Sequence, residues 1–238
     1  MLGQGKTVHL KHLVTTETGS ATKMANRHYE LGFGTEYEKF VLRGIVQSIV
    51  KELKIQSVCE YPANNLMGDN SEVFSGQVLK IDRLENYDRG KKGKYDLVWN
   101  FCEIEQNAAP VEILGRMLLL TRGYLLIVLQ NRRNPGVLLH RICHSLIGKR
   151  WDHGNPRWMS PDPVVQPLSK VGRVIRIGYF DVPWFVLDIY ESGILLRRMI
   201  PNALEGSMLR LRKSRFEEMP LFYKKWLAHH AYILFEKR

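Results

Sequence analysis

Two apolar strands with one helix between them, in the middle of the chain, constrain the fold most. Residues 95–100 (YDLVWN) are almost continuously apolar, as expected for a parallel strand that is buried on both faces. Pro110 suits the first turn of a helix, and apolar residues then recur at helical spacing up to Gly123, where we expect the helix to end. A second apolar strand covers residues 124–129. This order predicts a βαβ unit with parallel strands.

Further elements are expected on both sides of this unit. Residues 35–38 (TEYE) form a capping box in front of an amphipathic helix of residues 36–53. An apolar helix is expected after the polar loop of residues 131–136. Four more strands are expected at residues 55–60, 77–81, 171–180 and 231–235. Alternating strands and helices are typical of an α/β domain.

The chain divides into a short leader and one domain. Residues 1–29 are polar and have no apolar core, so we expect a flexible leader and not a signal peptide. Residues 30–238 then form a single domain, in which residues 149–170, rich in Trp, Pro and Asp, are expected to be a lid or insertion loop. The longest apolar run, within residues 117–130, falls short of the ~20 residues that a membrane-spanning helix needs.

Charge and cysteine usage limit the partners and the compartment. The chain has 35 Lys and Arg against 24 Asp and Glu, a net charge of +11 that favours an anionic partner such as nucleic acid or a membrane surface. Three widely separated cysteines in apolar surroundings indicate reduced thiols and a cytoplasmic protein. The adjacent pair His229-His230 has no further ligand close to it in sequence, so no metal site is predicted.

The middle of the chain resembles the class I S-adenosylmethionine-dependent methyltransferases. Residues 95–100 match their fourth strand, and residues 103–105 match the E-H pair that follows it. After a helix, residues 122–128 and Asn131 match their R-G-G-x-L strand, which ends in P-N. The ending at residues 229–234 (HHAYIL) is similar to their last strand. The resemblance implies a Rossmann-like open, mostly parallel sheet with helices on both faces and an antiparallel last strand. It also implies S-adenosylmethionine as cofactor.

The chain departs from that family at the cofactor loop. Glu60 is in the place of the acid that ends the first strand, but the G-x-G-x-G loop is replaced by YPANNLMG, in which only Gly68 remains. Asp82, 22 residues after Glu60, takes the place of the acid that binds the ribose. Too few residues follow Asp82 for a helix, a strand and another helix, so the middle region is shortened. Glu105-Gln106 replaces the E-H pair.

Candidate site residues follow from these matches. An alternative reading of each is a surface carboxylate, an ordinary turn or a loop anchor. The expected cofactor-binding residues are Glu60, Tyr61, Asn64, Gly68, Asp82, Asn100, Phe101 and Glu103. The expected substrate-binding residues are Asn131, Trp151 and Trp158.

Three functions remain open from the sequence. The first is methyl transfer from S-adenosylmethionine to a small or lipid-like molecule, in which proximity and orientation supply most of the catalysis. No residue identifies itself as a general base. The second is a catalytically inactive methyltransferase-like scaffold that binds a partner protein. The third, suggested by the charge of +11, is an RNA-binding or RNA-modifying protein.

Overall fold

The computed structural model of the chain describes residues 36–63, 73–74, 76–146, 148, 150–151, 154–181, 216 and 218–238. The predicted leader lies outside them. The helices are α2 (Glu36–Leu53), the 3₁₀ turn η3 (Arg89–Lys91), α3 (Pro110–Leu120), α4 (Pro135–Leu146), α5 (Pro161–Leu168) and α8 (Leu221–Leu227). The strands are β1 (Ser57–Glu60), β2 (Lys80–Arg83), β3 (Tyr95–Phe101), β4 (Thr121–Gln130), β5 (Gly172–Phe180) and β6 (His230–Lys237).

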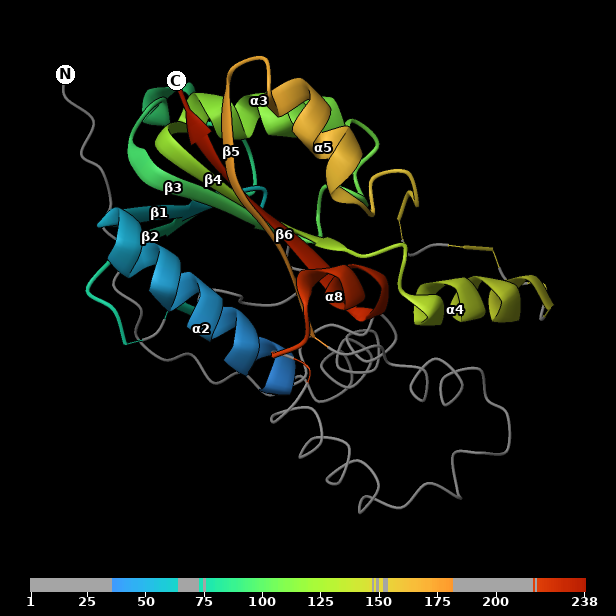
Figure 1. Ribbon diagram of the computed structural model, residues 1–238. Coiled ribbons are helices and arrows are strands. Elements are labelled where there is room, and N and C mark those ends of the chain that lie inside the picture. Colours follow the sequence, from blue (N-terminus) through green and yellow to red (C-terminus); the bar gives the residue numbers. More distant parts are fainter. Residues whose placement is uncertain are drawn as a thin grey trace, which may run out of the picture.

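The strands of the described residues form one six-stranded sheet in the order β2-β1-β3-β4-β6-β5. β1 is parallel to β2 and β3, and β3 is parallel to β4. Only β6 runs the other way, because it pairs antiparallel with both β4 and β5. Figure 1 shows α2 on one face of the sheet and α3 with α5 on the other, while α4 extends away from it. The expected Rossmann-like sheet with an antiparallel last strand is therefore confirmed.

Helix α2 covers its face of the sheet through an apolar stripe. Its predicted range, residues 36–53, agrees with the structure. Leu42, Val46 and Ile49 lie on one side of the helix and are at most 2% exposed. They pack in one core cluster with Leu97 and Trp99 of β3. Each such buried side chain contributes roughly 1.5–3 kcal/mol to folding, so this face holds the helix in place.

The central strands are apolar on both sides because helices cover both sides. In β4, Leu126 and Val128 face the α2 cluster, whereas Leu125 and Ile127 face the cluster that contains α3 and α5. All four side chains are fully buried. The continuous apolar pattern that predicted parallel strands therefore has the expected cause.

The boundary between α3 and β4 differs from the prediction. The helix ends at Leu120, so Arg122 and Gly123 lie inside the strand and not at a helix end. Arg122 donates to Asp96 of β3, with 2.7 Å between Nε and Oδ1. A Cβ on Gly123 would lie 3.1 Å from the Asp96 carbonyl oxygen, so the glycine permits close strand pairing. A sequence pattern typical of a helix C-terminus here serves a strand.

Two other predicted segments are corrected. β2 begins at Lys80, three residues later than expected, and between β2 and β3 the described elements include only η3. The segment of residues 149–170, expected to be a lid or insertion loop, contains the helix α5. Val164 and Leu168 of α5 are fully buried, so apolar contact with the sheet makes this proline-containing segment helical. None of the helices in the described residues combines the length and apolar character needed to span a bilayer.

Candidate functional site

The carboxyl ends of β1 and β3 meet where the order of the strands reverses. The chain passes from β1 to β2 on one side and then to β3 on the other side of β1. Open α/β sheets bind ligands in the crevice outside such a switch point. Backbone bonding fixes the two strand ends, since Tyr61 N donates to Trp99 O at 3.0 Å. Asn100 Nδ2 also donates to Tyr61 O at 3.1 Å.

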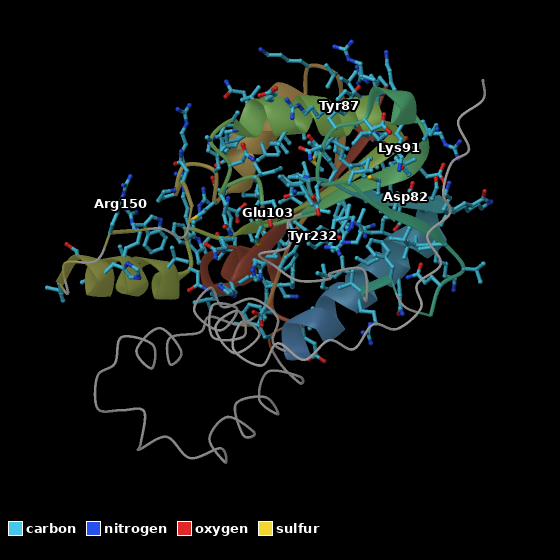
Figure 2. The ribbon with its side chains drawn as sticks, turned by 180° about the vertical axis from the view of Figure 1, so that it is seen from behind. Asp82, Tyr87, Lys91, Glu103, Arg150 and Tyr232 are labelled. Atoms are coloured by element: carbon cyan, nitrogen blue, oxygen red, sulfur yellow. The ribbon has the colours of Figure 1, made fainter. Side chains whose placement is uncertain are left out.

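Buried carboxyl groups gather at this edge. Glu60, Glu103 and Glu105 are 3%, 7% and 1% exposed. Arg83, the residue opposite Glu60 in β2, donates from Nε to Glu60 Oε2 at 2.8 Å. A buried charge is costly unless it is partnered, so a group of buried acids at a strand edge marks a candidate functional site. Figure 2 shows Glu103 near the middle of the molecule.

Glu105 is a buried carboxyl group whose pKa is strongly raised. Burial raises the pKa of Glu105 to about 8, against the lowering effect of the hydrogen bond from Gln130, and the nearby charge of Glu103 adds to the rise. The Gln130 backbone N donates to Glu105 Oε1 at 2.9 Å. Oε2 has no hydrogen-bond partner within the described part of the chain. Glu105 is therefore largely protonated at neutral pH. In the sequence, Glu105 could be recognised because Glu105-Gln106 takes the place of the family's E-H pair.

Asp82 lies one residue before the end of β2 and is tied to other groups. Its Oδ2 accepts from Tyr95 Oη at 2.5 Å and from Lys91 Nζ at 3.3 Å. Burial acts to raise the pKa of Asp82, but these two donors outweigh it and hold the pKa below its usual value. Asp82 and Lys91 lie together toward the β2 side of the molecule in Figure 2. Both bonds end on Oδ2.

Asn100 and Phe101 shape the end of β3. Asn100 is fully buried, and its Oδ1 accepts from Glu103 N at 3.2 Å while its amide group holds Tyr61. Cys102 then turns the chain with a φ of 55°. Phe101 packs in the core cluster beneath α2. Asn100 therefore braces both strand ends.

The expected residues on the loop after β1 are only partly described. Tyr61 is 1% exposed and belongs to the core cluster beneath α3, so its ring packs in the core. Ala63 N donates to Leu84 O at 2.8 Å, which extends the pairing of this segment with β2. Asn64 and Gly68 lie outside the described residues.

The three expected substrate residues have different contacts in the structure. Asn131 is buried, and its Nδ2 donates to Lys225 O and Ala228 O at 3.0 and 2.9 Å, at the end of α8. Trp158 packs against the cluster beneath α3 and α5. Trp151 lies beside α4, where its Nε1 donates to Gly154 O at 2.7 Å. Their role in substrate binding stays a prediction.

Sequence reasoning missed a second polar group at the same edge of the sheet. Asp181 follows β5, His229 precedes β6, and His230 is the first residue of β6. Asp181 Oδ2 lies 3.3 Å from His229 Nδ1. Burial lowers the pKa of His230 well below its usual value, and the neighbouring His229 lowers it further. Because 48 residues separate Asp181 from His229, the spacing gave no sign of this contact.

Comparison with known proteins agrees with this architecture. No protein-family model matches the sequence, and no curated protein matches it. The chain is similar to magnesium protoporphyrin IX methyltransferase from Synechocystis PCC 6803, solved with S-adenosylhomocysteine, at 8% identity over 92% of this chain and 95% of that one, with a TM-score of 0.50. A possible histamine N-methyltransferase from Thermotoga maritima gives 9% identity, coverage of 92% and 97%, and a TM-score of 0.49.

The likeness extends to an archaeal protein. A methyltransferase from Archaeoglobus fulgidus gives 12% identity, coverage of 82% and 94%, and a TM-score of 0.42. At such low sequence identities, structural similarity is evidence for the fold alone. The fold of this chain is that of the class I methyltransferases.

Proposed function

We propose that the chain is an S-adenosylmethionine-dependent methyltransferase that acts on a small or lipid-like molecule. The observation that carries the proposal is the group of buried glutamates at the switch point. Glu60 ends β1, and Glu103 and Glu105 follow β3. S-adenosylmethionine carries positive charge on its sulfonium and its ammonium group, and a carboxylate such as that of Glu60 attracts such charges in a place of low dielectric constant. Glu105 is largely protonated and adds a polar group without charge.

The residues present fit this cofactor in charge and in position. Glu60 is held by Arg83, so its carboxylate has a defined orientation. Asn100 fixes the backbone of Tyr61 and of Glu103, the two segments that border the crevice. The residues proposed to bind the cofactor are Glu60, Tyr61, Asn64, Gly68, Asp82, Asn100, Phe101 and Glu103. Asp82 would bind a ribose hydroxyl through Oδ1, because its Oδ2 is engaged by Tyr95 and Lys91.

Methyl transfer from this cofactor needs little covalent catalysis by the protein. When bound, the cofactor supplies a methyl group on a sulfonium, which is a good leaving group. The side chains of the crevice orient the acceptor in line with that methyl and exclude water, and such positioning can account for most of the rate. Asn131, Trp151 and Trp158 are proposed to border the acceptor. Glu105 is protonated near neutral pH, so it would orient an acceptor by donating a hydrogen bond.

Calorimetric titration of the full chain with S-adenosylhomocysteine tests the proposal. We expect saturable binding to the wild type and a loss of at least about tenfold in affinity in Glu60→Gln, which keeps the size but removes the charge. Glu52→Gln is the matched control, because Glu52 pairs with Arg176 on the exposed side of α2. Thermal unfolding of each variant confirms that it is folded.

Two results would overturn the proposal. One is no binding to the wild type at millimolar ligand, which would favour a scaffold without cofactor. The other is equal binding by Glu60→Gln and the wild type, which would place the ligand elsewhere. Transfer of a labelled methyl group to a panel of small and lipid-like acceptors then identifies the substrate class. Transfer to RNA alone would replace the proposed substrate class with nucleic acid.

A further inference from the structure

Asp181, His229 and His230 lie where the end of β5 meets the start of β6. Asp181 follows the last residue of β5, whose Phe180 pairs with His230 of β6. His230 in turn pairs with Gln130 at the end of β4. One ligand-type atom from each of the three residues lies within 4.8 Å of the others. All three residues are buried, with exposed fractions of 0%, 8% and 0%.

The separations suit a shared ligand. Asp181 Oδ2 and His229 Nδ1 are 3.3 Å apart. Two protein ligands on one tetrahedral metal ion, each at about 2.0–2.1 Å, lie about 3.3 Å from each other. The rings of His229 and His230 have centroids 4.2 Å apart and are tilted by 44°, and one ligand-type atom of each lies within 4.8 Å of an Asp181 carboxylate oxygen. The other Asp181 oxygen, Oδ1, has no hydrogen-bond partner among the described residues although it is buried.

We propose that Asp181, His229 and His230 bind one divalent transition-metal cation of the zinc class. Two imidazoles and one carboxylate form a donor set that such ions prefer, whereas Mg²⁺ and Ca²⁺ prefer oxygen ligands only. Three protein ligands leave at least one coordination position for water or for an oxygen of a bound molecule. This position would lie at the same edge of the sheet as the crevice between β1 and β3.

The surrounding structure holds the three groups in place before any ion arrives. His229 N donates to Asp181 O at 2.9 Å, and Asn131 N donates to His229 O at 2.8 Å. The His230 ring stacks on Phe180, with centroids 5.3 Å apart, and contacts Phe101 at 5.6 Å. Asp181 has a φ of 62°, a left-handed conformation that costs energy outside glycine, and its Oδ2 contacts His229 Nδ1. The His229 side chain is 10% exposed.

Metal titration of the full chain tests the proposal. After treatment with a chelator, the protein is titrated with Co²⁺, whose visible absorption is intense in tetrahedral sites, and then with Zn²⁺ as competitor. We expect one Co²⁺ per chain, displaced by one Zn²⁺, and at least about a hundredfold weaker binding in Asp181→Asn and His229→Gln. His144→Gln is the matched control, because His144 lies on α4 and contacts Arg150 and Trp151.

The shift of the thermal unfolding midpoint on addition of Zn²⁺ is a second measurement. It distinguishes loss of metal binding from a folding defect. Zn²⁺ should raise the midpoint of unfolding of the wild type and of His144→Gln, but not that of Asp181→Asn or His229→Gln. The proposal is overturned if the wild type binds no ion saturably. It is also overturned if the Asp181 and His229 variants bind like the control, because the ion then lies elsewhere. Neither result depends on S-adenosylhomocysteine binding, so the two proposals fail separately.

Discussion

Glu105 shows how burial sets the chemistry of a single residue. Its side chain is 1% exposed, and one carboxyl oxygen accepts the Gln130 backbone N at the end of β4. Burial raises the pKa of Glu105 to about 8, whereas an unfolded chain has a pKa of about 4.3 at this position. Between these two values the folded state holds a proton that the unfolded state has lost, so this group makes the protein less stable as the pH rises through that range.

Glu105→Gln removes this dependence on pH. The difference in free energy of unfolding, variant minus wild type, should increase as the pH rises from about 5 to 8. The increase should be up to about 1.4 kcal/mol for each pH unit, and the difference should then level off. Urea unfolding across this range measures it. The exposed Glu112, changed to Gln, is the control. Parallel profiles for Glu105→Gln and the wild type would show that Glu105 is ionised in the folded protein.

The pairing of β5 with β6 depends on a glycine. Gly178 lies opposite Tyr232, and a Cβ built on Gly178 would lie 2.2 Å from Tyr232 Cε1 and 2.4 Å from Cζ. The ring covers the position that a side chain would fill. Tyr232 is also part of the core cluster beneath α2, so the ring has little freedom to move.

Gly178→Ala should therefore destabilise the protein by about 1–3 kcal/mol, because the added methyl group forces the ring or the strand to shift. Gly115→Ala is the matched control, since Gly115 lies on the exposed side of α3 with nothing within 4 Å of its Cβ position. That change should stabilise the helix by about 0.5–1 kcal/mol. Denaturant unfolding of both variants measures the difference, and an unchanged midpoint for Gly178→Ala would contradict the packing described.

Elements with strong local patterns were predictable from the sequence. The helix α2 was predictable from its apolar stripe at helical spacing, and the strand β3 from its continuous apolar run. Arg122 and Gly123 resemble a helix C-terminus in sequence, but they belong to a strand pair in which Arg122 contacts Asp96, 26 residues away. The contact of Asp181 with His229 was invisible for the same reason. The acid at the end of β1 could be found from the family resemblance, but its ion pair with Arg83 required the register of β1 and β2.

At the scale of the whole molecule, the order of the strands places the candidate site. The strand order reverses at β1, because β2 lies on one side of it and β3 on the other. The ends of β1 and β3 are therefore adjacent, and buried glutamates lie there. The antiparallel β6 brings its first residues to the same edge, beside the ends of β4 and β5. A chain with a net charge of +11 therefore buries carboxyl groups along one edge of its sheet. The net charge alone favours an anionic partner, whereas the cofactor proposed for this edge carries positive charge on its sulfonium and its ammonium group.

A crystal structure of the full chain grown with S-adenosylhomocysteine tests this account most directly. We expect electron density for the adenosyl group at the carboxyl ends of β1 and β3, with the Glu60 carboxylate within hydrogen-bonding distance of the ligand. Density at another part of the molecule would contradict the account. So would a crevice closed by the protein's own side chains while the ligand is present at saturating concentration.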